Sequence, residues 1–216
     1  MQLASTIDHT RLGADTRVEH IQKLCSEAKD YGFAAVCVPP IFVEAATEFL
    51  KGSKVAVATV VGFPLGYQLT DVKVEEARQA LQQGATEIDM VIQQGAVQDG
   101  NWELVKMDIA AVQHEVKRIP GALLKVIIES CNLDDSQLHQ LCVILGDLKV
   151  DFAKTSTGFA KEGANIAVVT QMRAILPTSV RIKASGGIRT KEFALNLIAA
   201  GADRIGTSSG VELVQP

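Results

Sequence analysis

The sequence predicts an α/β protein whose single domain is a (β/α)8 TIM barrel. Short apolar, β-branched runs alternate with amphipathic segments along the whole chain, which indicates βαβ units and a parallel sheet. Eight such runs within 216 residues favour a closed barrel. An open doubly wound sheet would be expected to show a GxGxxG turn after its first strand, and the sequence has none there.

The eight apolar runs are the expected strands, and the amphipathic segments between them are the expected helices. We expect strands at Ala4–His9, Phe33–Val38, Val55–Val61, Glu87–Ile92, Leu123–Glu129, Asp151–Thr155, Arg181–Ala184 and Asp203–Gly206. We expect helices at Arg17–Asp30, Asp71–Gln83, Asn101–Arg118, Asp134–Leu148, Gly163–Leu176 and Lys191–Ala200. Thr70-Asp71 and Asp134-Asp135 are expected helix caps, and Gly32, Gly84 and Gly201 are expected helix ends.

The composition indicates one globular domain spanning residues 1–216. Hydrophobic residues make up 47% of the chain and charged residues 21%, which is ordinary for a soluble enzyme. A net charge of −4 without a basic run argues against a nucleic-acid binder. The longest apolar run falls short of the ~18 residues of a membrane span. The first residues lack the basic and apolar regions of an export signal.

The spacing of the cysteines and histidines gives no sign of a disulfide framework or of a metal site. The four cysteines, Cys25, Cys37, Cys131 and Cys142, show no CxxC spacing and are most simply reduced thiols in a cytoplasmic protein. The four histidines show no HxH or HExxH spacing, so we expect no metal site. The sequence also lacks a GxSxG elbow and a GxxxxGK[ST] loop.

Lys154 and Lys183 are the most informative residues, because each lies in an apolar segment with the pattern of a buried strand. Burying an ammonium group costs free energy unless something compensates it. A free lysine has a pKa near ~10.4, so about one amine in ~2,500 is neutral at pH 7. A second ammonium about 6 Å away would lower that pKa by about 2 units, and burial would lower it further. The pair predicts a Schiff-base nucleophile and a neighbour that depresses its pKa.

Carboxylates near this pair could move the protons that Schiff-base chemistry requires. Asp89 and Asp8 are the candidates. Side-chain alternation places Asp89 on the inward face with Glu87, and Lys125 on the inward face of the next strand. Each of these residues could instead belong to a structural ion pair, and Lys125 could simply balance Asp89. Asp8 could also be a helix cap or a turn residue.

Small residues after the last three strands predict a phosphate site. Backbone N–H groups and hydroxyls in Ser185-Gly186-Gly187 and Thr207-Ser208-Ser209-Gly210 could converge on an anion, and barrels commonly hold phosphate after strands 7 and 8. Gly158 could add a further N–H group. Plain turn chemistry is the alternative. Cys37, at a strand end, could border the pocket, although without a histidine partner it is more simply a packing residue.

Seven segments of the chain resemble deoxyribose-phosphate aldolase in its shorter form, and the resemblance runs from about Ile7 to Gly210. They are Ser5–Thr10, Ala35–Val38, Val61–Gly66, Glu87–Val91, Leu124–Glu129, Asp151–Gly158 and Lys183–Thr190. The KTSTG and KASGG motifs at this spacing are highly specific. The resemblance implies a TIM barrel and a class I aldolase without a cofactor. The implied reaction reversibly cleaves 2-deoxy-D-ribose 5-phosphate to acetaldehyde and D-glyceraldehyde 3-phosphate, as part of deoxynucleoside breakdown.

The resemblance also implies residue roles. Lys154 corresponds to the Schiff-base lysine, Asp89 to the acid/base, Lys183 to the pKa-lowering neighbour and Lys125 to a supporting lysine of the proton relay. We expect the substrate to be bound by Asp8, Cys37, Thr155, Gly158, Gly186, Gly187, Ser208 and Ser209, of which the glycines and the two serines resemble the phosphate site.

Three positions depart from the family pattern. Arg181 stands where a glycine is expected, and this extra inward cation would perturb the lysine pair unless Glu87 or another acid neutralises it. Phe159 stands where longer relatives can carry a lysine, so the phosphate site is expected to be less positive. Val211–Pro216 offers no counterpart of the C-terminal tyrosine that serves the relay in longer relatives.

Two other functions remain open at this point. A catalytically idle barrel could bind a phosphorylated sugar and act as a sensor, and another Schiff-base aldolase could use a different donor. The absence of an arginine cluster beside Lys154 weakly disfavours a keto-acid donor. The expected partners are a phosphorylated sugar and acetaldehyde, without nucleic acid or membrane, and a second copy of the chain in a homo-oligomer, most simply a homodimer.

Overall fold

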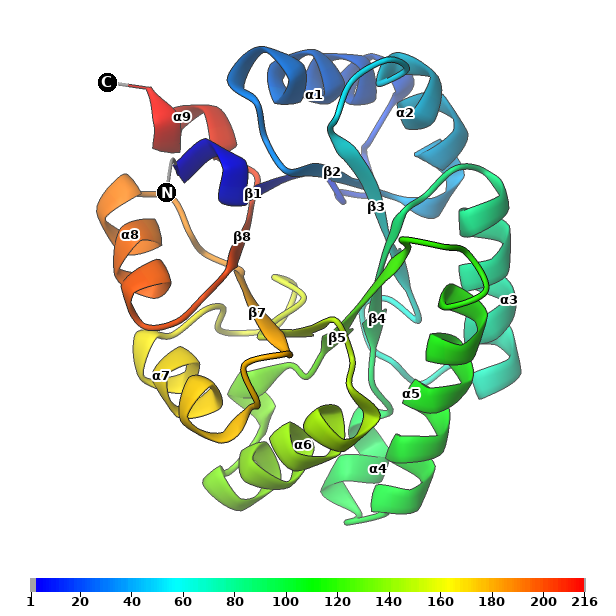
Figure 1. Cartoon of the computed structure of the whole chain (residues 1–216), viewed down its shortest axis with the longest axis vertical. Helices are drawn as coiled ribbons and strands as arrows, with labels where there is room; N and C mark the ends of the chain where they lie inside the picture. The colour runs from blue at the N-terminus through cyan, green and yellow to red at the C-terminus, as the bar shows by residue number, and fades with distance from the viewer. Residues whose placement is uncertain (1–2, 216) are drawn as a thin grey trace.

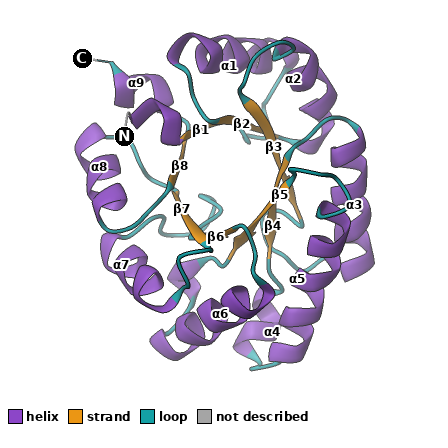
Figure 2. Cartoon of the chain, in the orientation of Figure 1, coloured by secondary structure: helices purple, strands orange, loops and turns teal. Residues whose placement is uncertain are grey.

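Eight parallel strands close into a barrel, and the helices form a layer around it (Figure 1; Figure 2). The structure, a computed structural model, describes residues 3–215, so Met1, Gln2 and Pro216 of the expected domain lie outside the described residues. The strands are β1 Ile7–Thr10, β2 Ala35–Val38, β3 Ala56–Val61, β4 Glu87–Val91, β5 Leu123–Ile127, β6 Phe152–Lys154, β7 Arg181–Ser185 and β8 Arg204–Thr207. Since β8 pairs with β1, the predicted barrel is confirmed.

The helices follow the strands in the order that the sequence predicts. They are α1 Val18–Tyr31, α2 Val43–Phe49, α3 Thr70–Gln82, α4 Gln94–Gln98, α5 Trp102–Val116, α6 Asp135–Leu148, α7 Ile166–Ile175, α8 Lys191–Ala199 and α9 Gly210–Val214. Within residues 3–215, the short 3-10 helices are η1 Leu3–Thr6, η2 Pro40–Phe42 and η3 Ser130–Asn132. The sequence did not single out α2, α4 and α9, which are too short to show a clear helical period. Among residues 3–215, no helix combines the length and hydropathy of a membrane span.

The helix boundaries confirm some of the expected signals and correct one. Asp134 caps α6 through a capping box with Gln137, and Gly32 ends α1 in the left-handed conformation. The prediction that Thr70-Asp71 caps a helix is wrong. The helix α3 begins at Thr70 without a side-chain cap, because the Thr70 hydroxyl donates 2.8 Å to Asp108 Oδ1 on α5 instead.

Each expected strand differs from the observed one by one to three residues at one end or both, and two of these differences have a visible cause. The strand expected at Ala4–His9 begins only at Ile7, because the preceding residues form η1, in which the Thr6 hydroxyl donates to the Leu3 carbonyl. The strand expected at Leu123–Glu129 ends at Ile127. Glu129 has a φ of 49°, so the chain leaves the extended conformation there and turns into η3.

Side chains that face outward from the strands pack against the helices and form the main core. Ala153 and Ile182, which the sequence places on the outward face, belong to this core. A smaller apolar cluster of Ala35, Cys37, Ala58 and Val60 comes from the two strands β2 and β3. The interior side chains of the other strands are largely charged, and they form the site described below.

A buried ion pair outside the barrel fixes the end of β4. Lys73 on α3 and Asp108 on α5 are fully buried and 2.6 Å apart. Lys73 Nζ also donates 2.9 Å to the carbonyl oxygen of Val91, the last residue of β4. Both helices are therefore tied to the strand that carries Asp89. The helical period places Lys73 on the buried face with Ala77, Ala80 and Leu81, but only the structure shows Asp108 as its partner.

Candidate active site

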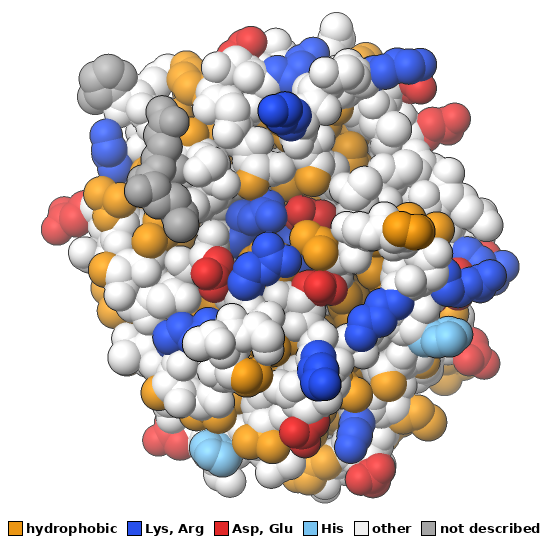
Figure 3. Space-filling view, in the orientation of Figure 1, with side chains coloured by type: hydrophobic (Ala, Val, Ile, Leu, Met, Phe, Trp, Pro, Cys, Tyr) orange, Lys and Arg blue, Asp and Glu red, His pale blue; other side chains and the backbone are white. Residues whose placement is uncertain are grey.

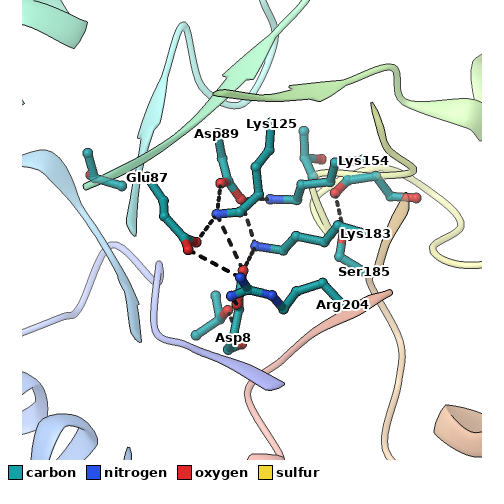
Figure 4. A network of polar contacts seen from close by, with 12 residues as sticks. Asp8, Glu87, Asp89, Lys125, Lys154, Lys183, Ser185 and Arg204 are labelled. Atoms are coloured by element: carbon teal, nitrogen blue, oxygen red, sulfur yellow. Dashed lines mark hydrogen bonds and ion pairs between the residues drawn. The ribbon is translucent and has the colours of Figure 1, made fainter. Parts of the chain in front are cut away.

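Side chains from the six strands β1, β4, β5, β6, β7 and β8 meet inside the barrel (Figure 4). In the strand register Lys154 lies beside Lys183, and Asp89 lies beside Lys125. Because alternate residues of a strand point to the same face, these four side chains share the interior, as predicted. All four are buried.

Asp89 is the centre of this group, because its carboxylate accepts hydrogen bonds from three lysines. Lys125 Nζ lies 2.7 Å from Oδ1, while Lys154 Nζ and Lys183 Nζ each lie 2.8 Å from Oδ2. Burial raises the pKa of Asp89, but the three ammonium groups outweigh it and hold the pKa well below its usual range. The Lys154 and Lys183 nitrogens both lie 2.8 Å from the same Asp89 oxygen. Their separation is therefore at most twice this distance.

The amine of Lys154 differs from its neighbours in the direction of its pKa shift. Burial lowers the pKa of Lys154, Asp89 raises it and the charge of Lys183 lowers it again, and the net shift is downward. Burial also disfavours the charge on Lys183, but Asp8 and Asp89 outweigh it and raise the pKa. The pKa of Lys125 is raised for the same reason, by Asp89 and Glu87. Lys154 is therefore the amine of the three that deprotonates most readily.

A second set of ion pairs lies beside Asp89, around Asp8 and Glu87. Lys183 Nζ and Arg204 Nη1 each lie 2.5 Å from an Asp8 oxygen, and Lys125 Nζ lies 2.5 Å from Glu87 Oε2. The sequence analysis did not single out Arg204, although alternation along β8 places it on the inward face with Gly206. Its two carboxylate partners, Asp8 and Glu87, lie 196 and 117 residues away in the sequence, so only the structure brings them together.

Arg181 does not pair with Glu87, which is engaged by Lys125 and Arg204. Its guanidinium carbon instead lies 3.9 Å from the centre of the Phe152 ring. Arg181 is half-buried, beside Phe152 in the register. A cation over an aromatic face is stabilised by the ring electrons, which explains how this arginine is accommodated without a carboxylate from Glu87.

A cavity of about 240 Å³ opens above the lysines at the carboxyl ends of the strands. The predicted site residues in its lining are Lys154, Lys183, Gly158, Gly186, Gly187 and Ser208. Residues that the sequence analysis missed in the lining include Thr10, Thr157 and Arg189. Arg189 supplies a cation near the glycine turns, where Phe159, with 57% of its surface exposed, supplies none.

The glycine turns of this cavity need residues without a side chain. Gly158, Gly186 and Gly187 have φ angles of 84°, 89° and 74°, in the left-handed region. A Cβ atom on Gly186 would lie 2.9 Å from the Cα of Gly163, so the two loops touch through backbone alone. The arrangement leaves backbone N–H groups near the cavity, as an anion-binding turn requires.

The other predicted substrate-binding residues lie next to the cavity lining. Asp8 and Cys37 are fully buried, and burial is the main cause that raises the pKa of the Cys37 thiol. The Thr155 hydroxyl accepts hydrogen bonds from Ser156 Oγ and from the Ser185 backbone N–H group. Ser209 precedes α9, and its N–H group donates to Thr207 Oγ1. The chemical roles of all these residues stay predictions.

Glu129 is a further buried residue that the sequence analysis missed as part of the site. Its carboxylate accepts hydrogen bonds from the Thr157 N–H group at 3.2 Å and from the Thr157 hydroxyl at 2.5 Å. The same hydroxyl accepts from the Phe159 N–H group. Glu129 thus holds the loop that contains Gly158. Its left-handed φ gave no signal in the sequence, since only glycine and asparagine commonly mark such positions.

Comparison with known proteins gives one consistent result. The model of the DeoC/LacD family of aldolases matches residues 3–215. A deoxyribose-phosphate aldolase of Thermococcus gammatolerans is 50% identical over 217 residues, which cover 100% of this chain and 96% of the relative. The enzyme of the same name from Caldicellulosiruptor saccharolyticus is 48% identical over 213 residues, 99% of this chain and 97% of the relative.

Solved structures agree with this assignment. The tetrameric deoxyribose phosphate aldolase of Aeropyrum pernix superimposes with a TM-score of 0.91 at 34% identity, over 98% of this chain and 89% of that chain. An aldolase named QR15 superimposes with a TM-score of 0.93 at 36% identity, over 99% of this chain and 95% of that chain. With the buried lysines and the glycine turns in the same barrel, these matches lead to one conclusion: the chain belongs to the DeoC/LacD family of aldolases.

Proposed function

We propose that this aldolase reversibly cleaves 2-deoxy-D-ribose 5-phosphate to acetaldehyde and D-glyceraldehyde 3-phosphate through a Schiff base on Lys154. The observation that carries the proposal is a buried amine with a lowered pKa, 2.8 Å from Asp89 Oδ2 and at the wall of a cavity. Such an amine can attack a carbonyl carbon at neutral pH. Relatives about half identical in sequence bear the name of this enzyme.

The proposed steps use the residues that surround Lys154. The neutral amine attacks the C1 aldehyde of the open-chain sugar, and loss of water gives an iminium ion. Removal of the C3 hydroxyl proton breaks the C2–C3 bond, and its electron pair moves toward the iminium nitrogen to give an enamine. Glyceraldehyde 3-phosphate leaves, a proton is added to C2, and water releases acetaldehyde. Asp89 is the proposed acid/base, because its carboxylate contacts Lys154 and two further ammonium groups.

The phosphate group is proposed to bind at Gly158, Gly186, Gly187, Ser208 and Ser209. All of these except Ser209 line the cavity that Lys154 also lines. Backbone N–H groups of left-handed turns bind anions well, and the Arg189 side chain in the same lining adds a positive charge. The phosphate would thus lie at one end of the cavity and the reacting aldehyde at the other.

The nucleophile can be identified by trapping. Borohydride reduction in the presence of acetaldehyde is expected to leave a stable ~+28 Da ethyl adduct on Lys154, since a primary amine and an aldehyde form an imine. Mass spectrometry of peptides locates the adduct. Lys154→Ala is expected to abolish both the adduct and turnover.

Lys161→Ala, which removes an exposed lysine a few residues further along the same loop, is the matched control and is expected to keep both. An adduct on Lys183 alone, or on neither lysine, would contradict the proposed role of Lys154. A wild-type protein that binds the sugar phosphate without forming an adduct would support the alternative of an idle, sugar-binding barrel.

The proposal also includes the cellular location of the enzyme. We place it in the cytoplasm, which is supported by the four cysteines, all of them free thiols among the described residues.

We also propose a homo-oligomer, most simply a homodimer. The loop between β3 and α3 supports this, since it exposes the large apolar side chains Leu65, Tyr67 and Leu69.

A further inference from the structure

Arg204 has no role in the steps proposed above, although it is tied directly to the buried charges around Lys154. It projects from β8 into the barrel, and only 12% of its side chain is exposed. Its guanidinium group donates to Asp8 Oδ1 at 2.5 Å and to Glu87 Oε1 at 3.2 Å (Figure 4). Asp8 and Glu87 in turn accept from Lys183 and Lys125. Through these two carboxylates, Arg204 is linked to Lys183 and Lys125, two of the three lysines that contact Asp89.

The ion-paired groups inside the barrel can be counted by charge. The anions are Asp8, Glu87 and Asp89, and the cations besides Lys154 are Lys125, Lys183 and Arg204. With a neutral Lys154 amine the anions and cations balance, and with a protonated Lys154 the cluster has one excess positive charge. A buried cluster disfavours excess charge. The balance therefore favours loss of the proton from Lys154.

We propose that Arg204 is a positioning residue that sets this charge balance and thereby keeps the Lys154 amine unprotonated at neutral pH. The inference rests on the proposed function of Lys154. Without the guanidinium group, Asp8 and Glu87 would each lose a cationic partner, and the cluster would carry an excess negative charge. Protonation of Lys154 would then restore neutrality. Arg204 thus acts on the nucleophile through the carboxylates and does not touch the substrate cavity.

The other groups that face Lys154 do not offer the same control. Asp89 contacts it from β4, the charge of Lys183 acts on it from β7, and the protonated Cys37 thiol lies on β2. The inward side chains of β3 are apolar. Glu129, beyond β5, is held by Thr157 at the mouth of the barrel.

Arg181 provides a matched control for Arg204. Both arginines lie on neighbouring strands near the Phe152 ring, at 3.9 Å for Arg181 and 5.5 Å for Arg204. Among the ion pairs of the described residues, Arg204 joins two carboxylates of the cluster, whereas none involves Arg181. Basic and acidic side chains meet at the centre of the face drawn in Figure 3, within the ring of strands. Removal of either arginine takes away one positive charge, but only Arg204 is part of the balance.

The test measures how imine formation on Lys154 depends on pH. Wild type, Arg204→Met, Arg204→Lys and Arg181→Met are each exposed briefly to acetaldehyde between pH 6 and pH 10. Borohydride is then added in one common buffer, and mass spectrometry quantifies the ethyl adduct on Lys154. A cation about 10 Å from an amine changes its pKa by about 1 unit at an effective dielectric of ~20.

Arg204→Met is therefore expected to move the half-maximal labelling upward by about 1 pH unit, with up to about tenfold less adduct at pH 7 and recovery in alkali. Arg204→Lys and Arg181→Met are expected to keep the wild-type profile. Glu87→Gln removes an anion, so it should shift the profile downward, and it tests the same balance if Arg204→Met does not fold. Circular dichroism reports the fold of each variant.

Two results would overturn the inference: a wild-type pH profile in Arg204→Met, or an equal loss of adduct at every pH. An upward shift in Arg181→Met as large as that in Arg204→Met would also overturn it, because the effect would then be a general loss of positive charge. Failure of the proposed function looks different, since the wild-type protein itself would then form no adduct on Lys154 at any pH.

Discussion

Lys154 and Lys183 carry the same amine on neighbouring strands, yet their surroundings shift their pKa values in opposite directions. Both are buried, and both donate to the same oxygen of Asp89. Lys183 has a second carboxylate, Asp8, at 2.5 Å, and this contact outweighs the cost of burial. Lys154 lacks such a contact among its described ion pairs. The additional contact with Asp8 therefore explains why the pKa of Lys183 is raised while that of Lys154, the proposed nucleophile, is lowered.

The residue-scale prediction concerns Lys183→Leu, which removes the positive neighbour of Lys154. The pKa of Lys154 is then expected to rise by about 2 units, because a cation within about 6 Å lowers it by that amount. Activity at pH 7 is expected to fall on the order of 10²-fold. Part of the loss should return in alkaline buffer, where more of the amine is neutral, and a pH–rate profile measures this.

Lys149→Leu, which changes an exposed lysine at the end of α6, serves as the control for loss of one positive charge and should leave the profile in place. The Lys183 prediction would be wrong if activity fell by the same factor at every pH. Lys183 would then act on the substrate directly, as a binding group or an acid, and not through the pKa of Lys154.

At the scale of elements, loops from different strands build the two ends of the cavity. The turn after β7 touches the loop after β6 through Gly186 and Gly163, and Glu129 after β5 holds that same loop through Thr157. Phe159 on this loop packs edge-to-face against Phe63 from the loop after β3, with ring centres 5.2 Å apart. The loop after β6 is thus fixed from three sides, while the turns that could bind phosphate stay open to the cavity.

The element-scale prediction concerns Ser208→Asp in the loop after β8. A carboxylate there would face the substrate phosphate, and like charges at close range repel by several kcal/mol at low effective dielectric. We expect kcat/KM for deoxyribose 5-phosphate to fall on the order of 10²-fold, with kcat/KM for unphosphorylated deoxyribose unchanged within a few-fold. Steady-state kinetics on both sugars measure the difference.

Ser53→Asp adds the same charge at the opposite end of the barrel, just before β3, and should change neither value. Because Phe159 carries no charge, the wild-type preference for phosphate should be smaller than in relatives with a lysine at that position, even though Arg189 shares the cavity lining. Equal losses on both sugars in Ser208→Asp would instead give Ser208 a structural role in the barrel.

At the scale of the whole molecule, barrel closure joins the two ends of the sequence at the proposed active site. Lys183 and Arg204 are 175 and 196 residues from Asp8, yet both contact its carboxylate. The inside of the barrel is divided, with an apolar cluster on β2 and β3 and the charged cluster on the other strands. Unfolding of either end of the chain would therefore break the charge balance around Lys154.

The whole-molecule prediction concerns assembly. Leu65, Tyr67 and Leu69 expose 51%, 72% and 75% of their surfaces, respectively. Burial of such side chains between subunits is favourable. Sedimentation velocity is expected to give the mass of a dimer, and Tyr67→Ser with Leu69→Ser is expected to shift it toward the monomer. A wild-type mass of 23.1 kDa would contradict the proposal.

The sequence alone was sufficient for the fold and for the inward face of each strand. The period of two along Phe152-Ala153-Lys154 places the lysine inside and the alanine against the helices, and the core contacts confirm this for Ala153. The order of strands and helices follows from the same local pattern. Local periodicity depends on neighbouring residues only, so it can be read without the tertiary structure.

Other features depend on which residues meet after the chain closes. The sequence analysis missed Arg204, Arg189 and Glu129, and it expected Thr70 to cap a helix where its hydroxyl binds Asp108. It also left the partners of Arg181 open. Only the tertiary structure gives Lys183 two carboxylates and Lys154 one, and so sets the directions of their pKa shifts. The reason is physical: a pKa depends on distances of a few ångströms between charges, and barrel closure fixes those distances between residues far apart in the sequence.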